Sequence, residues 1–195
     1  MFDISENKQA PVFLYELENA VDDDILCMCL DPLGRVIYTG SGEGTMKIFM
    51  LGEGCEPPVM IFNIRKVHND EFNCLALDTI NGIMCTASQD KSVKIFDTKL
   101  VGLRWGRRPP KLLYHIQDAH KFGINSICVD PINKNLYTAS WDRSVKIWCL
   151  KEPHSWKKPN FWGDIEANAP ELLCHLKDLD IKGLWHVAID PFKQT

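Results

Sequence analysis

The sequence has no long apolar stretch and no basic, apolar N-terminal segment. A membrane-spanning helix needs about 20 consecutive apolar residues, and no run in this chain of 195 residues approaches that length. The first residues, MFDISENKQAPVFLYELEN, lack the basic start and the apolar run of a secretory signal. The sequence therefore predicts no membrane contact and a location in the cytoplasm, the nucleus or both.

The sequence also lacks the short motifs that carry most catalytic, cofactor and metal chemistry. It contains neither the GxSxG turn of a nucleophilic serine nor a phosphate-binding P-loop. Its eight cysteines are scattered without a CxxC pair, and Cys27 and Cys29 have the wrong spacing for a zinc site. We therefore expect reduced core thiols, no metal, no cofactor and no enzymatic activity.

Excess positive charge is absent as well. The formal net charge is −4, which argues against a protein dedicated to nucleic acids, although a local basic patch remains compatible with it. The charge is unevenly placed, because residues 1–31 are strongly acidic whereas residues 99–111 contain only basic charged side chains. Such asymmetry can orient a partner, and the alternative is two differently charged solvated loops.

An internal repeat organises the chain. Four aspartates each end a short apolar run, and twenty residues before each of them a proline opens another apolar run. The aspartates are Asp31, Asp78, Asp130 and Asp190, and the prolines are Pro11, Pro58, Pro110 and Pro170. Successive aspartates are 47, 52 and 60 residues apart, a spacing typical of proteins that repeat one supersecondary unit.

Two further strand-like runs follow each of the first three aspartates and flank a tight turn. The turns read SGEG, SQDK and SWDR, and the runs after them alternate in polarity, as in Val145-Lys146-Ile147-Trp148. Alternation with period two indicates a strand with one buried face. Each unit therefore has four short strands, which is the composition of a β-propeller blade.

The repeat ending S-x-D-x-[ST]-V-K-I-[WF], with a histidine 22 residues before its aspartate, closely resembles the WD-repeat family. His68 and Asp90 have this spacing, and so do His120 and Asp142. The resemblance covers about residues 10–195 and is strongest in the third repeat. It implies an all-β fold of four-stranded antiparallel blades, about three and a half of them, in an open and incomplete ring.

The repeats also predict how the chain is divided. We expect repeat units at about 10–50, 57–98 and 109–150, a partial unit at 169–195, and loop insertions at 99–108 and 151–168. Propellers usually close with about four to eight blades. The missing blades would therefore come from a longer parent chain or from a second copy, since exposed strand edges otherwise favour aggregation.

The resemblance further implies a buried hydrogen-bond network inside each blade, made by a His before the first strand, a Ser or Thr on the second, an Asp in the turn and a Trp on the third. The third repeat supplies His120, Thr138 or Ser140, Asp142 and Trp148, and the second supplies His68, Thr86 or Ser88, and Asp90, with Phe96 in place of Trp. The first repeat has Val21, Glu43 and Phe49 at these positions, and the partial fourth has Asp180. Because Ser, His and Asp recur at the repeat spacing, we interpret them as a scaffold and not as a catalytic triad.

Two sets of loops are candidates for partner binding. In this family the loops before the first strand and between the second and third strands share one face, where Trp141 stands beside Lys121, Phe122 and Arg143. Trp and Arg are enriched among residues that carry binding energy, and the alternative is that Trp141 lies flat on its own blade. The opposite face would carry Arg104, Trp105, Arg107, Arg108, Trp156, Lys157 and Lys158, which suit either RNA or an acidic protein segment.

The sequence therefore predicts a non-catalytic scaffold or adaptor that binds other proteins. One alternative is an RNA-associated propeller that uses the basic and aromatic loops, and its binding would weaken steeply with salt. The other is a substrate receptor of a ubiquitin ligase. That alternative depends on the segments 96–99 and 148–151, which are degenerate versions of a WD-x-[KR] box.

Overall fold

The computed structural model describes residues 2–3, 12–13, 23–54, 56–103, 106–150 and 170–177. Its strands are β1 (Phe2–Asp3), β2 (Val12–Phe13), β3 (Ile25–Asp31), β4 (Val36–Ser41), β5 (Met46–Met50), β6 (Val59–Ile64), β7 (Cys74–Asp78), β8 (Ile83–Ala87), β9 (Val93–Asp97), β10 (Lys111–Ile116), β11 (Ile124–Asp130), β12 (Asn135–Ser140), β13 (Val145–Cys149) and β14 (Glu171–Leu176). Val21, Arg104, Trp105, Trp156, Lys157, Lys158 and Asp180 lie outside the described residues, as does the insertion 151–168. Within the described ranges, no helix is long and apolar enough to cross a membrane.

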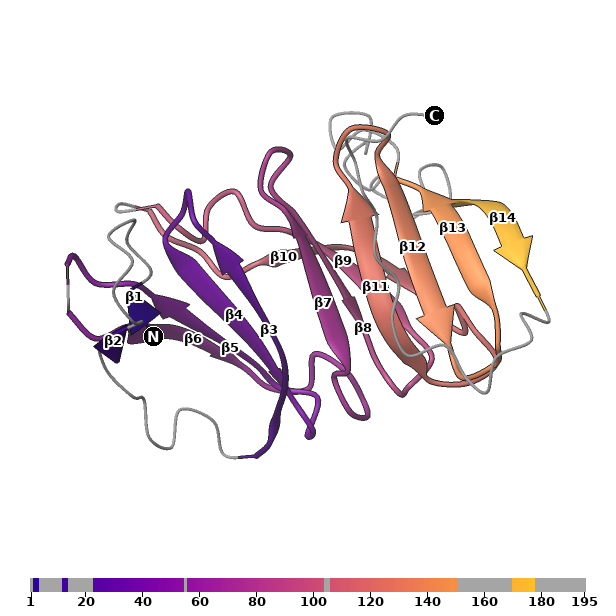
Figure 1. Cartoon of the computed structure of the whole chain (residues 1–195), viewed down its shortest axis with the longest axis horizontal. Helices are drawn as coiled ribbons and strands as arrows, with labels where there is room; N and C mark the ends of the chain where they lie inside the picture. The colour runs from indigo at the N-terminus through magenta and orange to yellow at the C-terminus, as the bar shows by residue number, and fades with distance from the viewer. Residues whose placement is uncertain are drawn as a thin grey trace, which may run out of the picture.

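Three four-stranded antiparallel sheets make up the body of the structure. Their strand orders are β3-β4-β5-β6, β7-β8-β9-β10 and β11-β12-β13-β14, so each sheet uses four strands that follow one another in the sequence. Figure 1 shows the sheets side by side as adjacent blades, in an arc that does not close into a ring. The predicted all-β, open array of blades is confirmed.

The N-terminal apolar run, which Pro11 opens, pairs differently from its repeat equivalents β6, β10 and β14, which are the fourth strands of their blades. Its described part, β2, instead pairs with β1 in a separate two-stranded sheet, with Phe2 opposite Phe13. A fourth strand needs the third strand of its own blade as a partner, and among the described residues before β3 there are only the two short strands β1 and β2.

The repeated aspartates explain where the first strand of each blade ends. Asp31 accepts hydrogen bonds from the backbone N–H groups two and three residues later, at 3.0 and 2.9 Å. Asp78 and Asp130 make the same pair of bonds. A side chain that replaces backbone partners in this way favours a tight turn over a longer strand. Each turn therefore reverses the chain into the second strand.

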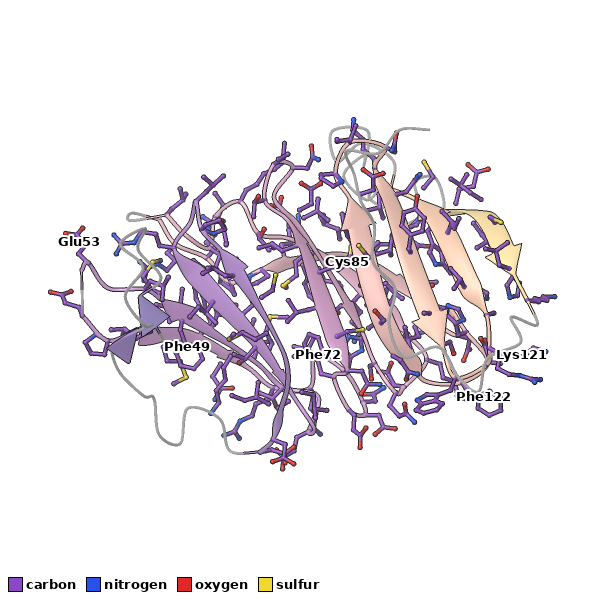
Figure 2. The ribbon with its side chains drawn as sticks, in the orientation of Figure 1. Phe49, Glu53, Phe72, Cys85, Lys121 and Phe122 are labelled. Carbon is purple, nitrogen blue, oxygen red and sulfur yellow. The ribbon has the colours of Figure 1, made fainter. Side chains whose placement is uncertain are left out.

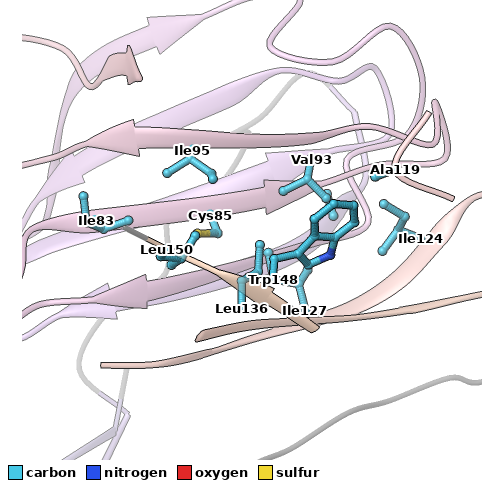
Figure 3. Packing of buried hydrophobic residues seen from close by; sticks show 11 residues of the cluster. Ile83, Cys85, Val93, Ile95, Ala119, Ile124, Ile127, Leu136, Trp148 and Leu150 are labelled. Atoms are coloured by element: carbon cyan, nitrogen blue, oxygen red, sulfur yellow. The ribbon is translucent and has the colours of Figure 1, made fainter. Parts of the chain in front are cut away.

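The hydrophobic core lies between the sheets. One cluster joins the first blade to the second, with Tyr38 and Ile48 packed against Met84 and Phe96. The other joins the second blade to the third, and Figure 3 shows members of it, including Cys85 and Ile95 of the second blade with Leu136 and Trp148 of the third. Because side chains alternate across a strand, the second blade offers one apolar face to the first blade and the other to the third.

In the part of the chain that the structure describes, no blade packs against the outer face of the first blade. Leu75 and Leu77 on β7 pack against the first blade, and Ile127 on β11, which is 7% exposed, packs against the second. The equivalent residues of the first blade, Met28 and Leu30, are 67% and 45% exposed. The repeat therefore supplies apolar residues for a contact that the described part of the chain does not make.

Candidate functional site

The second blade contains a buried hydrogen-bond network centred on His68. The ring nitrogen Nε2 lies 2.8 Å from Thr86 Oγ1, and Nδ1 lies 3.1 Å from both Asp90 Oδ2 and Ser92 Oγ. Asp90 also accepts hydrogen bonds from the Ser92 hydroxyl and from the Asn69 backbone N–H. His68 is 1% exposed and Thr86 is fully buried, so the network ties the loop before β7 to the turn between β8 and β9.

The third blade repeats this geometry and adds an indole. His120 Nε2 lies 2.7 Å from Thr138 Oγ1, and its Nδ1 lies 3.1 Å from Asp142 Oδ2. Trp148 Nε1 donates to the same Thr138 oxygen at 3.1 Å. The structure thus brings together the His, Thr, Asp and Trp positions of the third repeat, whereas Phe96 in the second blade has no N–H to donate.

The carboxyl groups of the two network aspartates have lowered pKa values. Burial alone would raise the pKa of Asp142, but hydrogen bonds from Ser144 and the Lys121 backbone N–H and the proximity of His120 outweigh it and lower the pKa to about 2. The pKa of Asp90 is lowered in the same way by His68, Ser92 and Asn69. Burial, only partly opposed by Asp142, lowers the pKa of His120 to about 4. At neutral pH a neutral His120 imidazole therefore faces an ionised Asp142.

Two serines that the sequence interpretation did not assign to the network belong to it. Ser92 and Ser144 are 4% and 2% exposed and donate to Asp90 and Asp142 at 2.6 and 2.5 Å. They occupy the [ST] position of the repeat ending, two residues after the aspartate. That position in the motif was the available signal, but its role becomes visible only when the turn is folded.

Ser88 and Ser140 have a different role from Thr86 and Thr138. Ser140 Oγ donates to the backbone carbonyls of Phe122 and Gly123, at 3.1 and 2.9 Å, and accepts from the Asp142 N–H at 3.1 Å. Ser88 joins Asp70 O to the Asp90 N–H in the same way. These serines therefore fasten the loop before the first strand to the turn between the second and third strands.

The first blade has different side chains at the network positions. Glu43, in the aspartate position, is exposed, and the residue after it, Gly44, has a φ of 71°, as Lys91 and Arg143 have positive φ values in the other two blades. Thr39 Oγ1 bonds to the Lys47 carbonyl at 3.2 Å, and Phe49 is 6% exposed and has no polar atom to offer. Val21, in the histidine position, lies outside the described residues.

A hollow of about 740 Å³ opens at the end of the blades where these fastened loops meet. It is lined by Leu26, Glu71, Asn73, Gln89, Phe122, Gly123, Asn125 and Trp141, from all three blades. Phe122 is 59% exposed and Trp141 is 39% exposed, so both rings are available to solvent at its edge. Figure 2 shows Phe122 and its neighbour Lys121 projecting from this end of the third blade.

The four residues proposed for partner binding divide into two pairs. Phe122 and Trp141 line the hollow, and the backbone N–H of Trp141 donates to Gly123 O at 3.1 Å. Lys121 and Arg143 are exposed nearby but do not line it. Arg143 has a φ of 62°, in the left-handed region, because it follows Asp142 in the tight turn.

The cysteines and the basic loop complete the predicted sites. The described cysteines are free thiols, and burial raises the pKa of Cys27 to about 12, so it is an unreactive core group. In the described ranges, no group of three or more His, Cys, Asp or Glu side chains is placed to hold a metal. Arg107 and Arg108 lie on the opposite face, where Arg107 Nε donates to Leu103 O and the Arg108 N–H to Leu100 O.

Comparisons with known proteins agree with this geometry. The family model described as WD domain, G-beta repeat matches residues 12–49, 59–97 and 111–149, which is more than half of the chain. No curated protein matches the chain. Two solved structures, the RRP9 WD40 repeats and U3-55K, resemble it with a TM-score of 0.58 at 15% sequence identity, over 80% of this chain. The chain spans only 39% and 40% of their lengths, and this likeness shows the fold alone. The chain belongs to the WD40 repeat family.

Proposed function

We propose that the chain is a protein-interaction scaffold and that the hollow lined by Phe122 and Trp141 is its binding site. The observation that carries this proposal is the exposure of two aromatic rings, 59% and 39%, on loops that the buried networks hold in place. Large aromatic side chains in a preformed depression are typical anchors of protein interfaces. Burying them against a partner removes apolar surface from water without a large ordering cost.

The polar part of the lining suits a peptide backbone. Asn73, Gln89 and Asn125 present amide groups to the hollow, and Asn73 Nδ2 already donates to Ile124 O at 2.9 Å. Amides both donate and accept, so they can pair with the N–H and C=O groups of an extended segment. Glu71 is an acidic side chain in the same lining, which favours a partner segment with a basic residue near its apolar anchor.

The family assignment supports the same conclusion. WD40 repeats are in general interaction modules, and the hydroxyls that accompany His68 and His120 are closed off from solvent. A buried Thr or Ser beside a His and an Asp has no access to a substrate, so these constellations stabilise the blades. The function is therefore to be sought in the exposed loops that they position.

The experiment compares proteins that co-purify with the full chain and with its variants. Trp141→Ala and Phe122→Ala are expected to reduce the recovery of specific partners while the melting temperature stays near that of the wild type. Leu112→Ala is the matched control, because Leu112 is 47% exposed on the outermost strand of the second blade, β10. Unchanged recovery with both aromatic variants, or loss of recovery only through unfolding, would refute the proposal.

An RNA-associated function is the second candidate, because Arg107 and Arg108 stand among exposed side chains on the opposite face. Binding of RNA phosphates through such arginine side chains releases counterions, so the affinity falls steeply as the salt concentration rises. A uridine oligonucleotide whose affinity falls with salt, and falls again in Arg107→Ala/Arg108→Ala, would favour it. In the segments that resemble a ubiquitin-ligase box, Phe96, Thr98, Trp148 and Leu150 are each at most 8% exposed, Lys99 is exposed, and Lys151 lies outside the described residues.

We further propose that additional blades cover the outer face of the first blade. Met28 and Leu30 are 67% and 45% exposed there, whereas their repeat equivalents Leu75 and Leu77 pack against the neighbouring blade. Those blades would come from a longer chain or from a second copy. Analytical ultracentrifugation of this chain distinguishes the two: a concentration-dependent dimer supports a second copy, and a monomer supports a longer chain.

A further inference from the structure

The turns that join the first and second strands carry an exposed aliphatic residue at the same place in every blade. Leu33 is 79% exposed, Ile80 is 77% exposed and Ile132 is 53% exposed. Each lies two residues after the aspartate that ends β3, β7 or β11. We call these three side chains the aliphatic row.

The fold requires the turn but does not require these side chains. The backbone N–H groups of Leu33, Ile80 and Ile132 donate to the preceding aspartate carboxylate at 3.0, 3.0 and 2.9 Å. Such turns are normally filled by small or polar residues, because the tip projects into water. A single exposed aliphatic residue is ordinary. Three at the same position of successive blades instead indicate a surface for binding a partner.

The connection between β9 and β10 extends this surface. Its Thr98 N–H donates to Gly82 O at 2.9 Å, in the turn of the second blade. A Cβ on Gly102 would stand 2.9 Å from Gly34 Cα, so the connection runs directly against the turn of the first blade. Leu100 and Leu103 on this connection are 44% and 42% exposed. The aliphatic row therefore continues into a pair of exposed leucines.

Basic side chains surround the aliphatic residues. They are Arg35, Lys99, Arg107, Arg108 and Lys134, from the turns of the first and third blades and from the β9–β10 connection. Of the turn aspartates, Asp78 and Asp130 are only 5% and 3% exposed. Asp31, Asp97 and Glu53 are the acidic side chains here that reach solvent, and Glu53 lies 3.9 Å from Arg35. The surface is apolar in the centre, with more basic than acidic side chains reaching solvent around it.

We propose that this surface binds an acidic, amphipathic segment of another protein. Leucine or phenylalanine side chains of the segment would pack on the aliphatic row, and its carboxylates would face the surrounding Lys and Arg. Aliphatic side chains offer no ring on which nucleic-acid bases stack, so the described residues suit a protein partner better than RNA. The surface is at the opposite end of the blades from Lys121 and Phe122 (Figure 2), and the proposal is independent of the hollow there.

The test is selection of a displayed random peptide library on the full chain, followed by measurement of Kd for the enriched peptides. The proposal predicts acidic peptides with spaced apolar residues. Their Kd is expected to rise about tenfold or more in Leu33→Gln/Ile80→Gln and to rise as well in Arg107→Glu/Arg108→Glu. Leu176→Gln is the matched control, because Leu176 is 45% exposed at the end of β14, away from these turns, and it should leave these Kd values unchanged.

Three results would overturn the proposal. The selection could enrich no peptide, or only peptides whose Kd is the same in the wild type and in Leu33→Gln/Ile80→Gln. A uridine oligonucleotide could bind this face more tightly than any peptide, in a manner that depends on Arg107 and Arg108 but not on Leu33. Because the replaced aliphatic side chains are at least 77% exposed, the variants should keep the wild-type circular dichroism and melting temperature.

Discussion

Asp142→Ala is the substitution that most sharply tests the role of the buried networks. The carboxylate accepts hydrogen bonds from His120 Nδ1 at 3.1 Å, from the Lys121 N–H at 2.9 Å, and from the Ser144 N–H and hydroxyl at 3.0 and 2.5 Å. Alanine removes all these acceptors together. His120 and Ser144 are each 2% exposed, so water cannot replace what they lose.

The expected cost follows from the groups left without a partner. A buried donor or acceptor that loses its partner costs about 1–3 kcal/mol. Two such groups are stranded in Asp142→Ala, so we expect the free energy of unfolding to fall by about 3 kcal/mol. Glu43→Ala is the matched control, since Glu43 has the same place in the first blade but is exposed, and such surface changes stay within about 0.5 kcal/mol.

Urea unfolding followed by tryptophan fluorescence measures both variants. We expect a large shift of the midpoint for Asp142→Ala and almost none for Glu43→Ala, with the slope of the transition unchanged. Equal midpoints for the two variants would refute the claim that the network stabilises the third blade. A changed slope would instead show that a single blade had come apart from the array.

Three further predictions concern the same blade. The pKa of His120 is about 4 in the folded chain against an ordinary 6.5, so the neutral imidazole stabilises the fold fully above pH 6.5 and this stabilisation is lost as the pH falls toward 4. The melting temperature should fall over that pH range, and it should fall less in His120→Gln. Trp148→Phe removes the donor to Thr138 and should cost about 1–2 kcal/mol in urea unfolding, and no loss would mean that the indole N–H contributes nothing. Arg143 has a φ of 62°, so Arg143→Gly should be nearly neutral while Arg143→Val, β-branched, should destabilise by more than about 1 kcal/mol; equal midpoints would contradict the assigned turn.

The strands were predictable because the sequence marks both their length and their end. The runs ILCMCLD and INSICVD are β3 and β11 from first to last residue. The apolar run that ends at Asp78, FNCLALD, begins two residues before β7, which starts at Cys74. Phe72 is instead fully buried in the core between the first and second blades. Apolar character alone does not distinguish a strand residue from a buried loop residue.

The network was only partly predictable from the motif. The spacing of His120 and Asp142 indicates that they meet, but Thr138 and Ser140 lie on the same strand and remained alternatives. The structure gives Thr138 to the imidazole and Ser140 to the loop carbonyls. The difference depends on how far the loop that contains His120 extends along β12, and this cannot be read from the spacing of residues in the sequence.

The two proposed surfaces show the limit of sequence reasoning. The hollow combines residues near the first strands of three blades, such as Leu26, Asn73 and Asn125, which are about fifty residues apart in the chain. The aliphatic row was not identified, because Leu33, Ile80 and Ile132 lie in turns where an apolar residue has no clear meaning. Only their exposed fractions reveal that the core does not use them.

The most direct test of the central claim, that the Phe122–Trp141 hollow binds protein, is site-specific photocrosslinking. A photoreactive phenylalanine analogue is placed at Phe122 of the full chain, with Leu112 as the control position of comparable exposure. The account predicts discrete adducts at Phe122 that protease removes and ribonuclease does not, and that disappear when Trp141 is replaced by alanine. No adduct at Phe122 above the level at Leu112, or adducts sensitive to ribonuclease, would contradict it.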